Sequence, residues 1–380
     1  MRYSKISESL YIKGRIGWKG LKKKEYLQEG SYRIINGSNI VDNKIDWSNC
    51  GYISKERYDE SEEIKLKEGD ILITKDGTIG KVAMVNKLDK PSTVASGLFI
   101  LRNINLKKWD TLYLFYYLQS FKFKEFIYSR TSGSVIPHLY QRDFEELMIP
   151  ELSLKQQKQI SQKIHSIQQK IDLNNKINTN LLELGLELIS NINFENYQSL
   201  NKIVEVKDGT HSSPASTLNG YPLVTSKAIK GTSVDFSQTK NISEADFTEI
   251  NKRSLVEYHD ILISMIGTVG IVHLVTENPV KYAIKNVGLI KSSDKKLLSP
   301  FLYLYLLSYY GQTYIRKHLS GSTQQFISLT NLRKMPIPIS SDIPAKLIEK
   351  LNTIVLQIEH NSNENNTLNS IKNVLLEKYF

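Results

Sequence analysis

Apolar residues recur at helical spacing along two long segments that contain almost no glycine or proline. The first runs from about Leu154 to Ile192, and its isoleucines and leucines follow one another at intervals of 4, 3, 4, 6, 4, 3 and 4 residues from Ile160 to Leu188. The second runs from about Ala345 to the C-terminus with a comparable stripe. A narrow apolar seam of this kind is typical of helices that pair in a coiled coil. We expect these segments to be the longest helices of the protein.

Each long segment has a polar middle, NNKINTN at 174–180 in the first and HNSNENN at 360–366 in the second. If the two helices pack antiparallel, these asparagine-rich middles lie near each other, and the apolar ends of each helix meet the opposite ends of the other. An alternative is that each helix packs only on its own domain. The matching polar middles argue against that alternative.

The remaining sequence contains an internal repeat. GDILITKDGTIGKVAMV at 69–85 and HDILISMIGTVGIVHLV at 259–275 lie 190 residues apart and share nine of 17 positions. The glycines do not fit a phosphate-binding P-loop, because Gly80 and its lysine are followed by Val82. They instead predict a hairpin, in which Gly77 and Gly80 supply the positive φ that a tight connection needs.

A second pair of motifs follows at an offset of 188 residues: TSGSVIPHLYQRDFEELMIP at 131–150 and LSGSTQQFISLTNLRKMPIP at 319–338. Both keep Ser-Gly-Ser and end in Ile-Pro. An aromatic run typical of a helix precedes each motif, from residue 111 and from residue 299. Each half of the chain is therefore predicted to be strand, turn, strand, helix, polar loop and strand.

Composition narrows the setting and the partners. The chain has 380 residues, and 50 Lys and Arg against 39 Asp and Glu give a net charge of +11 and a pI near 9.3, which suits a polyanionic partner. Cys50 is the single cysteine, so no intramolecular disulfide and no cysteine-based zinc site can form. The sequence lacks a signal-peptide core and a run of about 18 apolar residues. We expect a non-exported protein of a reducing cytoplasm.

Two diverged repeats with Asp-Ile-Leu-Ile, Gly-Thr-x-Gly, Ser-Gly-Ser and Ile-Pro, each followed by a long heptad-like helix, resemble the DNA-specificity (S) subunit of type I restriction-modification systems. The resemblance covers essentially the whole chain. It implies an α+β fold with two pseudo-repeated target-recognition domains, separated by two long helices that form an antiparallel coiled coil. The implied domains are 1–150 and 197–338, with a central spacer and partner-binding helix at 151–196 and a C-terminal helix at 339–380 that pairs with it.

The resemblance also implies a function in phage defence. Such a subunit binds double-stranded DNA at a split sequence and directs adenine methylation and DNA cleavage by partner subunits, which are two methyltransferase subunits and a restriction and translocation subunit. S-adenosylmethionine, ATP and Mg are expected on those partners, and this chain is expected to bind no cofactor, no metal and no membrane.

The sequence contains no catalytic motif of its own. It has no Pro-Pro, so it lacks the Asp/Asn-Pro-Pro-aromatic motif of DNA adenine methyltransferases, and it has no nucleophile elbow and no Walker sequence. A stand-alone nuclease or methyltransferase would need a further domain. Two alternatives stay open: a specificity subunit of a related methyltransferase-nuclease or phage-defence system, and a coiled-coil interaction protein whose charge is incidental.

DNA contacts are expected in polar, basic loops that differ between the repeats, because two halves that read different bases should diverge where they touch them. In the first repeat the candidates are Arg15, Trp18, Lys19, Lys22, Lys23, Lys24, Arg33, Asn36, Ser38, Asn39 and, in the hairpin, Lys75. In the second repeat they are Lys207, Asp208, Thr210, His211, Ser212, Ser226, Lys227 and Lys230. The loops after the aromatic runs add Arg130, Ser132, Ser134, His138 and Arg142, and then Arg316, Lys317, Ser320, Ser322, Gln324 and Gln325.

These residue types suit different parts of a DNA surface. Lysine neutralises phosphates, arginine bridges guanine O6 and N7, and glutamine bridges adenine N6 and N7. The shared Ser-Gly-Ser does not vary between repeats, which favours a role in holding the loop or a phosphate. A lysine run is also typical of a solvated face, Trp18 also fits a core, and His211 also fits a turn. Lys75 has Met265 at its equivalent position, which favours a structural role for the hairpin turn.

Overall fold

The computed structural model describes residues 3–15, 20–131, 138–231, 233–339 and 343–380. These residues form two compact units, and both long helices contribute to each of them. The first unit contains residues 1–172 and 366–380, and the second contains residues 173–365. Each unit mixes helices and sheets, so the predicted α+β class is confirmed.

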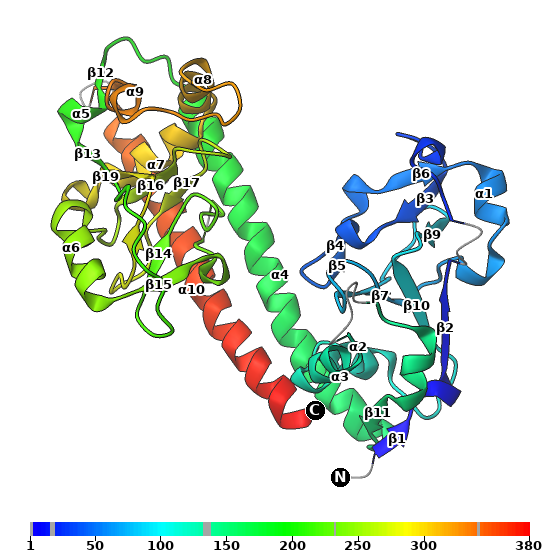
Figure 1. Cartoon of the computed structure of the whole chain (residues 1–380). Helices are drawn as coiled ribbons and strands as arrows, with labels where there is room; N and C mark the ends of the chain where they lie inside the picture. The colour runs from blue at the N-terminus through cyan, green and yellow to red at the C-terminus, as the bar shows by residue number, and fades with distance from the viewer. Residues whose placement is uncertain (1–2, 16–19, 132–137, 232, 340–342) are drawn as a thin grey trace. The chain divides into compact units, whose positions relative to one another are not determined.

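The two units share most of their elements in the same order, although β4 and β5 occur only in the first unit and α5 and α9 only in the second (Figure 1). The first contains β1 (Tyr3–Lys5), β2 (Leu10–Gly14), β3 (Tyr32–Ile35), β4 (Ile40–Val41), β5 (Lys44–Ile45), β6 (Gly51–Ile53), α1 (Lys55–Asp59), β7 (Ile71–Thr74), β8 (Val82–Met84), β9 (Ser92–Val94), β10 (Leu98–Asn103), α2 (Thr111–Tyr117), α3 (Phe121–Thr131) and β11 (Met148–Pro150). The second contains β12 (Tyr197–Ser199), α5 (Leu200–Ile203), β13 (Glu205–Asp208), β14 (Tyr221–Val224), β15 (Lys240–Ile242), α6 (Glu244–Ser254), β16 (Ile261–Ser264), β17 (Val272–Leu274), β18 (Ala283–Ile284), β19 (Val287–Lys291), α7 (Ser299–Leu307), α8 (Tyr309–Lys317), α9 (Leu329–Arg333) and β20 (Pro336–Pro338). The long helices are α4 (Leu154–Ser190) and α10 (Ala345–Tyr379).

The sheets repeat from one unit to the other. A four-stranded antiparallel sheet has the order β2-β10-β7-β8 in the first unit and β13-β19-β16-β17 in the second. A three-stranded sheet has the order β6-β3-β9 and β15-β14-β18, with one parallel pair in each, β3 with β9 and β14 with β18. A two-stranded ribbon, β1-β11 or β12-β20, brings the start of each repeat to its Ile-Pro end.

Alternating side chains of the central strands build two cores in each unit. Ile71 and Ile73 of β7 pack with the aromatic residues of α2 and α3, whereas Leu72 between them packs in a second cluster on the opposite face. In β16, Ile263 packs with α7 and Leu262 packs on the opposite face. This alternation follows from the two-residue period of a strand, and it explains why these strands read as continuous apolar runs.

The predicted glycine hairpin is confirmed in both repeats. Gly77 and Gly80 have φ of 66° and 85°, and Gly267 and Gly270 have φ of 81° and 91°. In the first repeat, Thr74 Oγ1 donates to the backbone oxygen of residue 78 at 2.6 Å and accepts from the amide of residue 81 at 2.9 Å. The glycines therefore shape the connection between two strands.

The aromatic runs differ from the prediction, because each forms two helices in place of one. The first run divides into α2 and α3, and the second divides into α7 and α8. At the second break Ser308 adopts an extended conformation, with φ −66° and ψ 168°, which ends one helix and begins the next. Ser120 lies at the first break, where its Oγ accepts from the Phe123 amide at 3.3 Å. The aromatic periodicity continues across both breaks and hides them.

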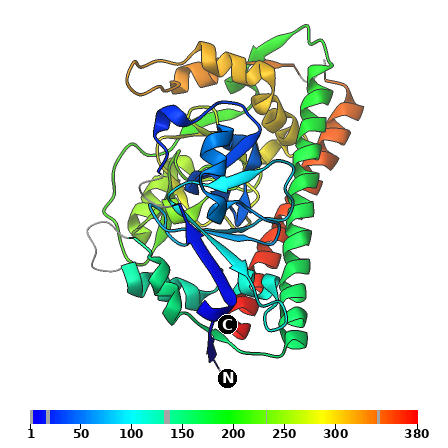
Figure 2. The same ribbon diagram turned by 90° about the vertical axis from the view of Figure 1, so that its right-hand side faces the viewer.

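The long helices α4 and α10 run antiparallel, as predicted, and lie side by side in both views (Figures 1 and 2). In the second unit, Asn174 Nδ2 donates to Asn365 Oδ1 at 3.0 Å, and Asn361 Nδ2 donates to Asn178 Oδ1 at 2.8 Å. The predicted polar middles therefore meet, which contradicts the alternative that each helix packs only on its own domain. No helix among the described residues is long and apolar enough to cross a membrane.

Each unit also contains a buried carboxylate at the start of its central hairpin. Asp70 is fully buried and accepts from Arg102 Nε at 2.6 Å and from the Lys67 amide at 2.7 Å. Asp260, also fully buried, accepts from Lys291 Nζ at 2.5 Å. The hydrogen bond to Asp70 raises the pKa of Arg102. Burial lowers the pKa of Lys291, but its hydrogen bonds to carboxylates outweigh burial and raise that pKa.

We expect Asp70→Ala to lower the free energy of unfolding of the first unit by about 3 kcal/mol, because removing one partner of a buried pair leaves the other charge uncompensated. Arg102 keeps some contact with water, which places the effect at the lower end of the usual range. The matched control is Glu125→Gln, which breaks an exposed pair with Lys122 on α3 and should change little. Denaturant unfolding of the full chain measures both, and equal effects of the two substitutions would contradict the assignment.

Candidate nucleic-acid interface

The two shared motifs of each repeat are hydrogen-bonded to each other. The Ile327 amide, in the loop after α8, donates to the Met265 oxygen at 3.0 Å, and the Leu139 amide in the first unit donates to the Lys75 oxygen at 3.1 Å. In the second unit the Gly267 amide also donates to the oxygen of residue 325 at 3.1 Å. In each unit the hairpin turn is therefore hydrogen-bonded to the loop after the aromatic helices. We call these two joined segments the motif edge.

The Ser-Gly-Ser loop of the second unit is closed by its own backbone. Ser320 and Phe326 exchange two backbone hydrogen bonds of 2.9 Å. Gly321 has a φ of 91°, and a Cβ there would lie 2.3 Å from the Gln324 oxygen. This geometry favours the loop-holding interpretation of the shared motif, and it leaves Gln324 and Gln325 exposed at the tip.

Parallel strand pairing brings two further loops to one edge of the second unit. Val224 of β14 pairs with Ile284 of β18. Because the two strands are parallel, the residues that follow them, 225–231 and 285–286, emerge together. In the first unit the parallel pair β3 and β9 places 36–39 beside 95–97 in the same way.

A cleft of about 1000 Å³ lies between these loops and the motif edge of the second unit. Its described lining residues include four of the predicted DNA contacts and no carboxylate. The lining consists of Thr225, Ser226, Lys227, Ile229, Lys230, Gly231, Gln238, Ile266, Gly267, Thr268, Ile271, Lys285, Asn286 and Gln324. Three lysines with amide and hydroxyl groups give this cleft the donors that phosphates and base edges accept.

The segment VKDGTH at 206–211 contacts the end of β18 and the loop that follows it. The Thr210 amide donates to the Ile284 oxygen at 3.0 Å, and a Cβ at Gly209 would lie 2.3 Å from that same oxygen, so only glycine fits. His211 Nδ1 lies 2.8 Å from Asn286 Oδ1, and His211 Nε2 lies 2.9 Å from Asp208 Oδ2. The predicted His211 and Asp208 thus position Asn286 at the cleft.

Residues 15–183 and 196–370 each match the family described as Type I restriction modification DNA specificity domain. The chain belongs to this family. The prediction of a DNA-specificity subunit with two repeated domains is therefore confirmed. Such a subunit recognises DNA sequence and is the non-catalytic component of its complex.

Individual relatives agree with the family. The type I restriction enzyme MjaVIII specificity subunit of Methanocaldococcus jannaschii is 26% identical over 356 residues, which cover 83% of this chain and 79% of that protein. The MjaX specificity subunit of the same organism is 27% identical over 371 residues, which cover 87% and 82%. The crystal structure of a type I S subunit from M. genitalium matches with a TM-score of 0.54 at 18% identity, covering 100% of this chain and 96% of that one, and shows the same fold.

The structure places two of the predicted DNA contacts, Arg15 and Arg33, in buried positions with protein acceptors. Arg15 is 3% exposed, and its Nε donates to the Val94 oxygen at 3.1 Å. Arg33 is 8% exposed and forms a two-pronged ion pair with Asp89. Burial lowers the pKa of Arg15, whereas the hydrogen bond to Asp89 raises that of Arg33. Both guanidinium groups therefore donate hydrogen bonds to acceptors within the first unit.

Asn39 and Asp208 are also buried. Asn39 is buried, accepts from the Asn36 amide at 2.8 Å and donates to the Asn49 oxygen at 2.9 Å, so it holds its own loop. Asp208 is buried beside His211 and forms an ion pair with Arg253. The polar groups of both side chains therefore bind other residues of the same specificity domain.

Other candidates have partners within their units. Lys75 Nζ lies 4.7 Å from the centre of the Phe99 ring, and burial lowers its pKa, which favours the structural interpretation. Seven further side chains have protein partners: Asn36 with Tyr26, Arg130 with Glu146, His138 with Asp76, Arg142 with Tyr140, Lys207 with Glu205, Thr210 with Ser212, and Arg316 with Thr313.

The remaining candidates are exposed or lie outside the described residues. The exposed ones are Lys22, Lys24, Ser38, Lys317, Ser320, Ser322 and Gln325. The residues outside the described ranges are Trp18, Lys19, Ser132 and Ser134, and the side chain of Lys23 is not described either. The exposed residues keep their prediction as DNA contacts.

The cleft residues that the sequence interpretation missed include Gln238, Lys285 and Asn286. The first repeat has Ala95, Ser96 and Gly97 where the second has Lys285 and Asn286, so the two repeats share no motif there. A usable signal was the polar Lys-Asn pair between two apolar strand segments.

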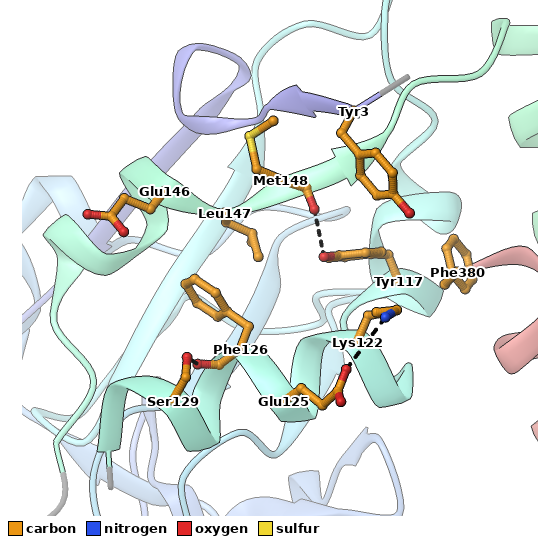
Figure 3. Close-up of a pocket in the computed structure, with 10 residues that line it drawn as sticks. All are labelled: Tyr3, Tyr117, Lys122, Glu125, Phe126, Ser129, Glu146, Leu147, Met148 and Phe380. Carbon is orange, nitrogen blue, oxygen red and sulfur yellow. Dashed lines mark hydrogen bonds and ion pairs between the residues drawn. The ribbon is translucent and has the colours of Figure 1, made fainter. Parts of the chain in front are cut away.

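A hollow of about 360 Å³ in the first unit has a different character (Figure 3). Tyr117 donates to the Met148 oxygen at 2.8 Å across it, and Phe380, the residue after α10, lies at its side. Its charged groups are paired, Lys122 with Glu125 on the same helix and Glu146 with Arg130. Its lining includes the carboxylates Glu125 and Glu146, which disfavour a phosphate backbone, whereas the described lining of the cleft has none. Among the described residues, no cluster of histidine, cysteine and carboxylate groups fits a metal ion.

Replacing Lys227, Lys230 and Lys285 by glutamine should weaken DNA binding by the full chain and make it less sensitive to salt. The slope of log affinity against log salt should fall by about 0.9 for each phosphate that the variant no longer neutralises. The matched control removes the same charge from three exposed lysines outside the cleft, Lys202, Lys346 and Lys350. Fluorescence anisotropy across a salt series measures both variants, and an equal decrease of the slope in the control would show that only net charge matters.

Proposed function

We propose that the chain selects a split double-stranded DNA sequence, one half read by each repeat, and presents it to partner subunits of a type I restriction-modification complex. Two methyltransferase subunits would methylate adenine in the selected sequence, and a restriction and translocation subunit would cut unmodified DNA. The proposed place of action is the prokaryotic cytoplasm, where the DNA and these partners are found.

The cleft of the second unit is the observation that carries this proposal. Its backbone edges belong to the scaffold that both repeats share, but its three lysines do not recur in the first repeat. Lys227 and Lys230 suit phosphates, and Gln324 and Asn286 can pair with adenine in the major groove. Equivalent edges with different side chains are what two domains need to read two different half-sites.

The long helices support the assignment of the partners. They connect the repeats, and their outer faces are polar or charged over most of α4 and α10. The duplicated architecture suits two copies of one partner, because each repeat offers an equivalent set of elements. S-adenosylmethionine, ATP and Mg are assigned to the partners, since this chain carries no sequence motif for any of them.

Exchange of residues 197–338 for the matching domain of another specificity subunit should change one half of the methylated sequence and leave the other half unchanged. The chain is co-expressed with its genomic neighbours, and methylated bases are mapped by single-molecule sequencing. The parent chain in the same host is the control. A change in both halves would contradict independent reading, and an absence of adenine methylation with the parent chain would favour a related defence system.

The purified chain alone should not turn over S-adenosylmethionine and should not cleave DNA or hydrolyse ATP, because the chemistry is assigned to the partners. The measurement compares the highly purified chain with a mock preparation and with the co-expressed complex. Turnover of S-adenosylmethionine above the mock level by the chain alone would overturn the non-catalytic assignment.

A further inference from the structure

His273 is a polar residue at a core position of the shared hairpin. It lies on β17 and pairs with Leu262 of β16, and in the first repeat the corresponding pair is Ala83 with Leu72. The His273 side chain is 1% exposed, and Ala83 is fully buried. Replacement of a small apolar residue by a buried imidazole is unfavourable unless the ring makes hydrogen bonds. The reason for a histidine at this position therefore lies in the hydrogen-bond partners of the His273 ring.

The imidazole connects the hairpin to the cleft loop. His273 Nδ1 lies 2.9 Å from the Gly231 oxygen, and Gly231 lines the cleft next to Lys230. A carbonyl oxygen only accepts hydrogen bonds, so Nδ1 carries the hydrogen in this contact. The other ring nitrogen, Nε2, faces Glu277 Oε2 at 3.6 Å. The ring is thus oriented between a carboxylate on one side and the cleft loop on the other.

Backbone hydrogen bonds also hold this loop: the Ala228 amide donates to the Thr225 oxygen at 2.9 Å, and the Asp235 amide donates to the Ala228 oxygen at 2.7 Å. Ile229 pairs with Val234 in a single bridge, and the Lys230 amide donates to the Ser233 oxygen at 3.0 Å. Gly231 has a φ of 79°, which most side chains disfavour. To these backbone bonds His273 adds a side-chain bond from the core, which reaches the Gly231 oxygen next to Lys230. The first repeat holds its equivalent loop differently, through Asn39.

We propose that His273 is a positioning residue for DNA recognition by the second repeat. Through the hydrogen bond to Gly231 it sets the conformation of the cleft loop and so the base preference of one half-site. The proposal rests on the proposed function, and it concerns the second half-site alone. It also explains why the two repeats, which share the hairpin backbone, differ at this buried position.

Two substitutions of similar polarity separate positioning from packing. In His273→Asn the amide Nδ2 is attached to Cγ, as Nδ1 is in the imidazole, so it can donate to the same carbonyl. In His273→Gln the amide is one bond further from the backbone and does not match that position. Both variants lack the aromatic ring and its approach to Glu277, so they differ mainly in the bond to Gly231.

The full-length variants are incubated with a library of randomised DNA duplexes, and the bound sequences are read by sequencing. The wild-type chain should enrich a split sequence with two conserved halves. His273→Asn should keep both halves. His273→Gln should keep the first half and lose discrimination in the second by about tenfold, which corresponds to a carbonyl left without its donor. Thermal unfolding of each variant shows whether both units are folded.

The results distinguish the two levels of the argument. If the wild-type chain enriches no sequence, the proposed function itself fails. If the wild type succeeds and His273→Gln keeps full discrimination in the second half, the positioning role is overturned. Equal losses in His273→Asn and His273→Gln would also overturn it, because packing alone would then explain them. Should His273→Gln fail to fold, His273→Asn decides, since a folded chain with a degraded second half contradicts the proposal.

Discussion

A buried ion pair at the start of the central hairpin is the interaction on which each specificity domain depends. Asp70 and Asp260 immediately precede the first strand of their hairpins, and each forms an ion pair with a cation from the neighbouring strand. The cation is Arg102 in one repeat and Lys291 in the other. Both repeats therefore keep the ion pair, with a guanidinium in the first and an ammonium group in the second. Because the carboxylate also accepts from the preceding backbone, it fixes where the strand begins. The glycine turn of each hairpin follows at the same number of residues from this carboxylate in both repeats.

The division between scaffold and recognition surface follows from this constraint. Backbone hydrogen bonds join the hairpin turn to the loop after the aromatic helices in both repeats, as the bonds of Leu139 and Ile327 show. Side chains at this edge are free to change, because the backbone holds the edge in place. Two domains with one architecture can therefore present different donors and acceptors to DNA. The shared glycines belong to the scaffold, and the lysines and amides of the cleft belong to the surface.

The sequence predicted features that local spacing encodes. The apolar seams gave both long helices within two residues of their ends, and the glycines gave the hairpins. The site was harder, because polarity alone does not say where a side chain points. Arg15 and Arg33 were predicted at DNA, but each found an acceptor inside the unit. Lys285 and Asn286 were missed, because only the parallel pairing of β14 with β18 brings them beside residues 60 positions earlier.

The asparagine contacts between the long helices have a consequence for how the sequence can vary. An amide in a helix seam is satisfied only when its partner stands at the same height, as Asn174 does with Asn365. Sliding one helix along the other by a turn would leave several amides facing aliphatic carbon. The register of α4 against α10 is thus determined by the asparagines in the middle of the helices. The aliphatic residues toward the ends need only be apolar and of suitable size. Substitutions can accumulate in those outer turns while the helices keep the same register.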